Sequence, residues 1–254
     1  MNRYDGRVAL VVGGAQGIGA AAATAFGREG GVVVVADIDP AGEDVAARIR
    51  DGGGKAHFVA TDATDEAQVA ALADRILTDF GALHSACNLT GNIGALDRSN
   101  TEMLDGDRAG WDQTLALCAT SAFLCTRHQI RVMLETGGGA IANTASLAAI
   151  RINDHASPAY HAAKAGVIHL SRMAAVTYGG RGIRVNIVAP GLTATPRIVA
   201  AWDEDERARM ATVQPIGRMV TPEEVAEAYL WLCSSQASGV NGVTIPVDGG
   251  AAAR

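Results

Sequence analysis

Tyr160 and Lys164 are the residues of this chain whose types and spacing best suit proton transfer. Residues four apart on a helix share one face, so the lysine ammonium would lie beside the phenol. A free tyrosine ionises with a pKa of about 10, and a neighbouring cation lowers that pKa. The pair therefore predicts general acid–base chemistry on an alcohol or a carbonyl. The alternative is an aromatic–cation pair on a helix surface, without chemistry.

The lysine itself is informative. Of the 21 Lys and Arg residues, only Lys55 and Lys164 are lysines. A compact ammonium can also donate hydrogen bonds to ribose hydroxyls, for which an arginine is less suited. Lys164 is therefore predicted both to depress the pKa of Tyr160 and to hold a ribose.

A glycine-rich turn near the N-terminus predicts a dinucleotide site. It lies between a strand pattern and a helix pattern, and a helix N-terminus offers free N–H groups and partial positive charge to a pyrophosphate. Asp37 ends the second strand pattern, where a carboxylate suits ribose hydroxyls and repels a 2′-phosphate, so we expect NAD rather than NADP. The alternative is that Asp37 only caps a loop. The cofactor contacts expected here are Gly13, Gln16, Gly17, Ile18, Gly19, Asp37 and Ile38.

Further candidates follow other predicted strands, at the edge where open α/β sheets bind ligands. Ser146 would orient a substrate oxygen beside Tyr160, and no G-x-S-x-G pattern surrounds it, which disfavours a hydrolase nucleophile. Asp62, Ala63, Asn88 and Gly91 are expected to add cofactor contacts. Two alternatives stay open: Asp62 belongs to a helix-capping cluster, and Asn88 bridges loops.

The histidines do not suggest a metal. The six histidines lack the spacing of metal ligands, so no metal site is expected. His155 and His161 flank Tyr160 and are interpreted as ordinary polar or packing residues, with contact to substrate as the alternative.

The elements that must position these residues alternate along the chain. Strand patterns are expected at 7–12, 32–36, 55–60, 83–88, 140–145, 184–189 and 243–247, and helix patterns at 17–29, 41–51, 66–80, 109–136, 158–178 and 222–233. This alternation predicts a single α/β domain over residues 1–254: a Rossmann-type, doubly wound parallel sheet of about seven strands with helices on both faces. The longest irregular stretch, 190–222, is expected to be a substrate lid.

Composition excludes several classes of protein. Of the 254 residues, 48% are hydrophobic, which argues against a disordered chain. The net charge is −6 and no basic stripe is present, which argues against binding to nucleic acid. No apolar run reaches the roughly 20 residues of a membrane span. The N-terminus lacks signal-peptide form and the four cysteines lack C-x-x-C spacing, so we expect a cytoplasmic protein with reduced thiols.

Taken together, these motifs resemble the short-chain dehydrogenase/reductase family over nearly the whole chain. The family's T-G-x-x-x-G-I-G is similar to Val12–Gly19, its N-N-A-G to Asn88–Gly91, its serine to Ser146 and its Y-x-x-x-K to Tyr160 and Lys164. Its R-V-N and P-G segments are similar to 184–186 and 190–191. The resemblance implies an NAD-dependent oxidoreductase acting on CH–OH groups, with Ser146, Tyr160 and Lys164 catalytic. It further implies that Pro190, Gly191 and Thr193 wall the nicotinamide, and that the protein is a homotetramer or homodimer.

One departure from the family motivates a rival hypothesis. Cys118 stands where relatives carry an asparagine that helps connect the lysine to solvent through a water, and a thiol is a weak donor and acceptor. The rival is a dinucleotide-binding redox sensor or partner protein with little catalysis, and a purely structural subunit is a third hypothesis.

The substrate is not legible from the sequence. Apolar residues in the lid, with Leu192 and Trp202 as expected substrate contacts, suggest a fairly hydrophobic, cyclic or aromatic substrate. The alternative is that the lid packs on a neighbouring subunit.

Overall fold

The computed structural model describes residues 2–97, 102–152 and 156–254. Within them, parallel strands form one seven-stranded sheet in the order β3-β2-β1-β4-β5-β6-β7. The strands are β1 (Val8–Val12), β2 (Val32–Asp37), β3 (Lys55–Ala60), β4 (Ser85–Asn88), β5 (Gly139–Thr144), β6 (Ile183–Pro190) and β7 (Thr244–Val247). The predicted Rossmann-type fold is confirmed, and its strands lie within a few residues of the expected positions.

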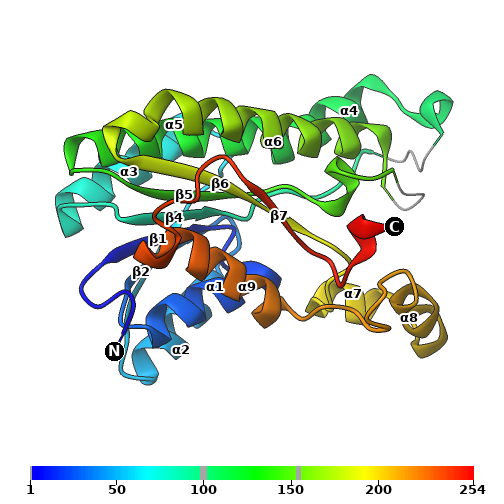
Figure 1. The fold of residues 1–254 in the computed structure, drawn as a ribbon, viewed down its shortest axis with the longest axis horizontal. Coiled ribbons are helices and arrows are strands. Elements are labelled where there is room, and N and C mark those ends of the chain that lie inside the picture. The colour runs from blue at the N-terminus through cyan, green and yellow to red at the C-terminus, as the bar shows by residue number, and fades with distance from the viewer. Residues whose placement is uncertain (1, 98–101, 153–155) are drawn as a thin grey trace.

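Helices cover both faces of the sheet, and Figure 1 shows the two layers. One layer holds α1 (Gly17–Arg28), α2 (Gly42–Asp51) and α9 (Pro222–Cys233), and the other holds α3 (Glu66–Phe80), α4 (Arg108–Leu115), α5 (Ser121–Glu135) and α6 (Pro158–Tyr178). All five residues of β1 are buried, as expected for a β-branched strand covered on both sides. Two large buried clusters, one beneath each helical layer, form most of the core, and a smaller third cluster includes Ile168 of α6 and Ile187 of β6.

The chain direction across the sheet reverses at β1. From β1 the sheet continues through β2 and β3 on one side, and β4 begins the series on the other side. Val12 is in register with Ala36 of β2 and with Asn88 of β4, so these strands end at the same level. In such sheets the crevice at the point of reversal is where ligands bind.

The predicted helix 109–136 is interrupted. A π-helical turn, Ala116–Thr120, separates α4 from α5. Such a turn adds about one residue to the helical repeat and needs no proline or glycine, so the sequence offers no signal of it. Turns of this kind are often found at functional sites.

The segment 190–222 is not wholly irregular, so that part of the prediction is wrong. It contains α7 (Pro196–Ala201) and α8 (Glu204–Ala211). Each begins with a capping side chain, because Thr195 accepts a hydrogen bond from Ile198 N and Asp203 from Glu206 N. α7 also carries proline at its first position, a known helix-start signal.

No helix in the described ranges is long and apolar enough to cross a membrane.

Candidate active site

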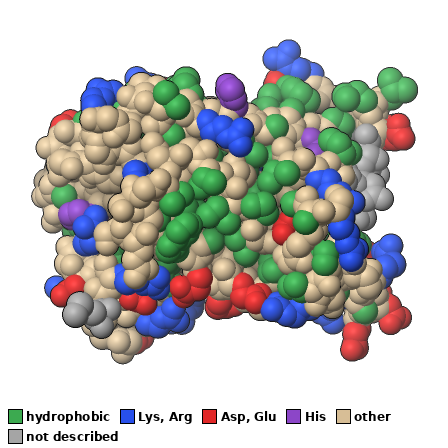
Figure 2. Space-filling view, in the orientation of Figure 1, with side chains coloured by type: hydrophobic (Ala, Val, Ile, Leu, Met, Phe, Trp, Pro, Cys, Tyr) green, Lys and Arg blue, Asp and Glu red, His purple; other side chains and the backbone are tan. Residues whose placement is uncertain are grey.

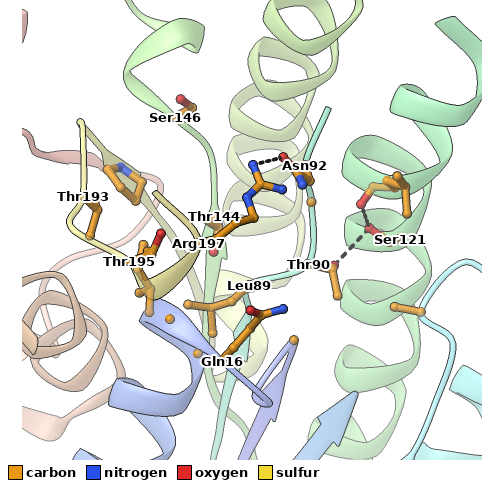
Figure 3. Close-up of a pocket in the computed structure, with 18 of the residues that line it drawn as sticks. Gln16, Leu89, Thr90, Asn92, Ser121, Thr144, Ser146, Thr193, Thr195 and Arg197 are labelled. Atoms are coloured by element: carbon orange, nitrogen blue, oxygen red, sulfur yellow. Dashed lines mark hydrogen bonds between the residues drawn. The ribbon is translucent and has the colours of Figure 1, made fainter. Parts of the chain in front are cut away.

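A cavity of about 550 Å³ opens at the carboxyl ends of the central strands (Figure 3). The glycine turn, the ends of the strands, the start of α6 and the segment after β6 all contribute to its wall. The sequence-predicted residues that line it are Gly13, Gln16, Gly17, Ile18, Gly19, Asp37, Ile38, Asp62, Ala63, Gly91, Ser146, Tyr160, Lys164, Pro190, Gly191, Leu192 and Thr193. Residues separated by most of the chain therefore meet in one cavity.

The glycine turn leaves the start of α1 open. No side chain caps the first turn of α1, and its residues Gly17, Ile18 and Gly19 line the cavity. A Cβ at Gly19 would lie 1.9 Å from the carbonyl oxygen of Gly13, so only glycine fits there. This combination of free N–H groups, helix dipole and bare backbone fits a pyrophosphate.

Asp37 supports the glycine turn and also lines the cavity. Its Oδ2 accepts a hydrogen bond from Ala15 N at 2.9 Å, and its Oδ1 accepts one from Asp39 N at 3.0 Å. The loop-capping alternative is therefore real, yet each carboxylate oxygen keeps a second lone pair for a ribose hydroxyl. Ile38 beside it is 70% exposed, an apolar surface open to a ligand ring.

Asp62 likewise combines two features. Its Oδ1 accepts hydrogen bonds from the backbone N and the hydroxyl of Thr64, within the helix-capping cluster that the alternative named. Asp65 is the actual cap of α3, and accepts from Ala67 N and Gln68 N. Asp62 still lines the cavity, next to Ala63.

The beginning of α6 positions Tyr160. Ser157 caps the helix by accepting a hydrogen bond from Tyr160 N at 3.2 Å, and Pro158 is its first residue. Lys164 lies one turn later, with its Nζ 5.7 Å from the centre of the Tyr160 ring. The expected shared face is thus present.

Lys164 is held by the end of β5. Its side chain is buried, and its Nζ donates a hydrogen bond to the carbonyl oxygen of Thr144 at 2.9 Å. The Cβ that Gly91 lacks would lie 2.6 Å from Nζ and 3.2 Å from the sulfur of Cys118. Glycine at position 91, whose φ is +130°, therefore makes room for the ammonium.

The protein's own groups do not make Tyr160 acidic. Desolvation raises the pKa of Tyr160 to about 12, while a hydrogen bond with Ser146 and the charge of Arg197 act in the opposite direction. Burial also lowers the pKa of Lys164. Lys164 is not among the groups that lower the pKa of Tyr160 in the protein alone. A lowered tyrosine pKa in the presence of both Lys164 and the positive nicotinamide ring stays a prediction.

Cys118 lies in the π-helical turn, buried beside Lys164. Its sulfur donates a hydrogen bond to the carbonyl oxygen of Asn92 at 3.3 Å. Burial raises the pKa of the Cys118 thiol, and the charge of Lys164 opposes that rise. A protonated, enclosed thiol is poorly reactive.

Two expected contacts are not brought to the cavity. Asn88 does not line it; its amide is buried and bonds to Gln129 and Asn143, the bridging role left open by the sequence. Trp202, which follows α7 in an extended conformation, does not line it either. His161 is not among the lining residues; its Nδ1 pairs with the carbonyl oxygen of Ala148. His155 lies outside the described residues.

Sequence reasoning missed Arg197 and Asn92. Both line the cavity, and Arg197 Nη2 donates a hydrogen bond to Asn92 Oδ1 at 2.8 Å (Figure 3). The sequence signal for Arg197 is that it is a single cation in the apolar run that follows Thr195 and Pro196. Thr195 was missed too; it lines the cavity opposite Gly17, whose Cβ would lie 3.2 Å from its methyl carbon.

The fold and this cavity define a Rossmann-type protein with a cavity at the point where the strand order reverses. A family model described as enoyl-(acyl carrier protein) reductase matches residues 13–252. The chain belongs to the short-chain dehydrogenase/reductase family.

Similar proteins narrow the class of reaction. The chain is 46% identical to cis-4-hydroxycyclohexanecarboxylate dehydrogenase of Sinomonas cyclohexanicum, over 96% of each chain. It is 37% identical to D-threitol dehydrogenase of Mycolicibacterium smegmatis, over 98% of this chain and 94% of that one. The crystal structure of levodione reductase superposes with a TM-score of 0.91 at 31% identity, over 98% and 99% of the two chains. The protein is thus an oxidoreductase that acts on CH–OH groups with a nicotinamide cofactor.

Proposed function

We propose that this protein is an NAD(H)-dependent dehydrogenase/reductase that interconverts a secondary alcohol and its ketone, with Tyr160 as the general acid and base. The observation that carries the proposal is one continuous cavity that joins the uncapped start of α1 to Tyr160, Lys164 and Ser146. When bound there, the nicotinamide supplies or accepts the hydride.

Three residues of the chain carry out the other parts of the reaction. Ser146 lines the cavity within hydrogen-bonding reach of Tyr160, and it orients the substrate oxygen. Tyr160 takes the hydroxyl proton during oxidation and returns it during reduction. Lys164, fixed by Thr144, donates to ribose hydroxyls when the cofactor is bound. Its charge then adds to that of the oxidised nicotinamide in favouring the ionised phenol.

The preference for NAD over NADP follows from Asp37. Its carboxylate lies at the end of β2 in the cavity wall, and no Arg or Lys lines that part of the cavity within the described residues. A 2′-phosphate there would meet a negative charge with no compensating cation.

The lid role of 190–222 remains part of the proposal. Leu117, Leu192 and Ile198 give the cavity that holds Ser146, Tyr160 and Lys164 apolar parts of its wall. The relative at 46% identity named above is a cis-4-hydroxycyclohexanecarboxylate dehydrogenase, whose name contains a cyclohexane ring. Together these favour an alicyclic or aromatic alcohol over an open-chain polyol.

The experiment is a screen of secondary alcohols and ketones, cyclic and open-chain, with NAD⁺ and NADH and with NADP⁺ as control. We expect NAD⁺-linked turnover of a cyclic secondary alcohol. NADH binding without turnover across the panel would contradict the proposal and favour the sensor. A melting temperature unaffected by NAD⁺ would favour a structural subunit.

Self-association is also proposed. Figure 2 shows hydrophobic side chains gathered across the centre of the face that carries α9 and β7. Trp231 of α9 and Val243 before β7 are large hydrophobics exposed by more than a third. Apolar patches of this kind mark subunit interfaces, and light scattering would distinguish a homotetramer or homodimer from a monomer. A cytoplasmic location stays a prediction.

A further inference from the structure

The charged residues of the cavity are separated by sign. Among the described lining residues, the carboxylates are Asp37 and Asp62, and the cations are Lys164 and Arg197. Asp37 ends β2 and Asp62 follows β3, whereas Lys164 bonds to the end of β5 and Arg197 follows β6. Because β2 and β3 lie on one side of β1 and β5 and β6 on the other, the acidic and basic parts occupy opposite ends of the cavity.

The two cations differ in burial and in hydrogen bonding. Lys164 is buried and fixed on a backbone carbonyl. Arg197 is exposed, and its one hydrogen bond in the described chain goes to the neutral amide oxygen of Asn92. No ion pair joins it to a carboxylate of the described residues. Since a guanidinium carries five N–H donors in a planar fork, Arg197 keeps an open face for an anion.

Arg197 lies near the reacting end of the cavity. Its charge lowers the pKa of Tyr160, so it is within electrostatic reach of the phenol. Its partner Asn92 follows Gly91, which packs against Lys164. Figure 3 shows the Arg197 side chain reaching Asn92 across the cavity from the segment after β6. An anion held by Arg197 would therefore lie beside the alcohol that Tyr160 deprotonates.

Part of the wall of this cavity is apolar. Leu117 and Ile198 line the same cavity as Arg197, and Leu192 follows the end of β6. We infer that the substrate is a hydroxy acid, whose carboxylate is bound by Arg197 and whose hydrocarbon ring lies on these apolar side chains. The inference rests on the proposed function and makes Arg197 its determinant of specificity.

The other anion that Arg197 could bind is the pyrophosphate of the dinucleotide. That group already has the uncapped start of α1, next to Gly17 and Thr195. Arg197 instead bonds to the Gly91–Asn92 loop on the catalytic side. The geometry therefore favours the substrate carboxylate.

The test measures binding as well as turnover. Cyclohexanecarboxylate and its neutral analogue cyclohexanecarboxamide are titrated calorimetrically into the protein with and without NADH, and the NADH affinity is measured separately. We expect the native protein to bind the carboxylate at least tenfold more tightly than the amide. Arg197→Met should remove that preference and leave NADH affinity within twofold, whereas Arg197→Lys should keep part of the preference.

Two further variants isolate the cause. Asn92→Asp places a carboxylate against Arg197, so it should reduce the preference about as much as Arg197→Met. Arg209→Met is the matched control, because Arg209 is an exposed lid arginine outside the cavity wall, and it should change nothing.

Two results would overturn the inference. One is equal affinity of the native protein for carboxylate and amide. The other is a fall in NADH affinity in Arg197→Met with an unchanged preference, which would assign the guanidinium to the pyrophosphate. Absence of turnover with every alcohol would count against the proposed function alone, since the binding ratio is still measured.

Discussion

Lys164 lies one helical turn from Tyr160, yet its ammonium bonds to the carbonyl of Thr144 and stays 5.7 Å from the centre of the phenol ring. The end of β5 holds the Lys164 ammonium through this hydrogen bond. Helix α6 carries the Tyr160 phenol on the same face. Because desolvation dominates, the pKa of Tyr160 rises to about 12 in the protein alone. The proposed chemistry therefore depends on positive charge that arrives with the cofactor.

The first prediction concerns the pH dependence of the two directions of reaction. Oxidation needs ionised Tyr160, whose fraction grows tenfold per pH unit below its pKa, so kcat/KM for oxidation should rise with pH. Reduction needs the protonated form and should fall as pH passes the pKa. Steady-state profiles in both directions measure this, and an oxidation rate that is flat with pH would contradict the role of Tyr160.

The same raised pKa has a consequence for stability. The folded protein favours protonated Tyr160, so this contribution is fully present below about pH 10, the ordinary tyrosine pKa, and is lost as pH rises towards about 12. Alkaline unfolding of Tyr160→Phe, compared with the native protein, should lack that loss.

The second prediction concerns Gly91→Ala. The new Cβ would lie 2.6 Å from Lys164 Nζ at a φ of +130°, so the ammonium must move from Thr144. We expect kcat to fall at least tenfold and the free energy of unfolding to fall by about 1–3 kcal/mol. Gly53→Ala is the control, since Gly53 also has positive φ but nothing within 4 Å. It should lose some stability and keep its activity; equal activity in both variants would refute the packing argument.

The third prediction concerns Asp37→Asn. The amide oxygen can still accept a hydrogen bond, but the charge that repels a 2′-phosphate is gone. We expect the ratio of kcat/KM with NAD⁺ to that with NADP⁺ to drop at least tenfold. A ratio unchanged by the substitution would show that Asp37 only supports the loop through Ala15 and Asp39.

The fourth prediction separates the enzyme from the redox sensor. All four cysteines are buried, and burial raises the pKa of the Cys118 thiol. A thiol reagent should therefore label the native protein slowly and all four cysteines after denaturation. Rapid, single-site labelling of Cys118 that is prevented by NADH would instead support the sensor.

Sequence reading succeeded where the signal is local or strictly periodic. The β-branched runs of β1 and β2 and the spacing of Tyr160 and Lys164 translate directly into buried strands and a shared helix face. The π-helical turn at Ala116–Thr120 was not foreseen, because one added residue hardly alters the pattern of apolar positions.

Tertiary contacts account for the remaining differences. Arg197 acquires its place only when the segment after β6 meets Asn92, more than a hundred residues earlier. Asn88 turns away from the cavity because Gln129 and Asn143 satisfy its amide in the core. Neither set of hydrogen bonds corresponds to a recognisable spacing of residue types in the sequence.

The most direct test of the central claim is Tyr160→Phe, assayed for turnover and for NADH binding in the same preparation. The substitution removes one hydroxyl from a ring that lines the cavity and leaves the glycine turn and Lys164 in place. The account predicts that kcat falls by at least two orders of magnitude while the NADH dissociation constant changes less than threefold. Turnover close to that of the native protein would contradict it.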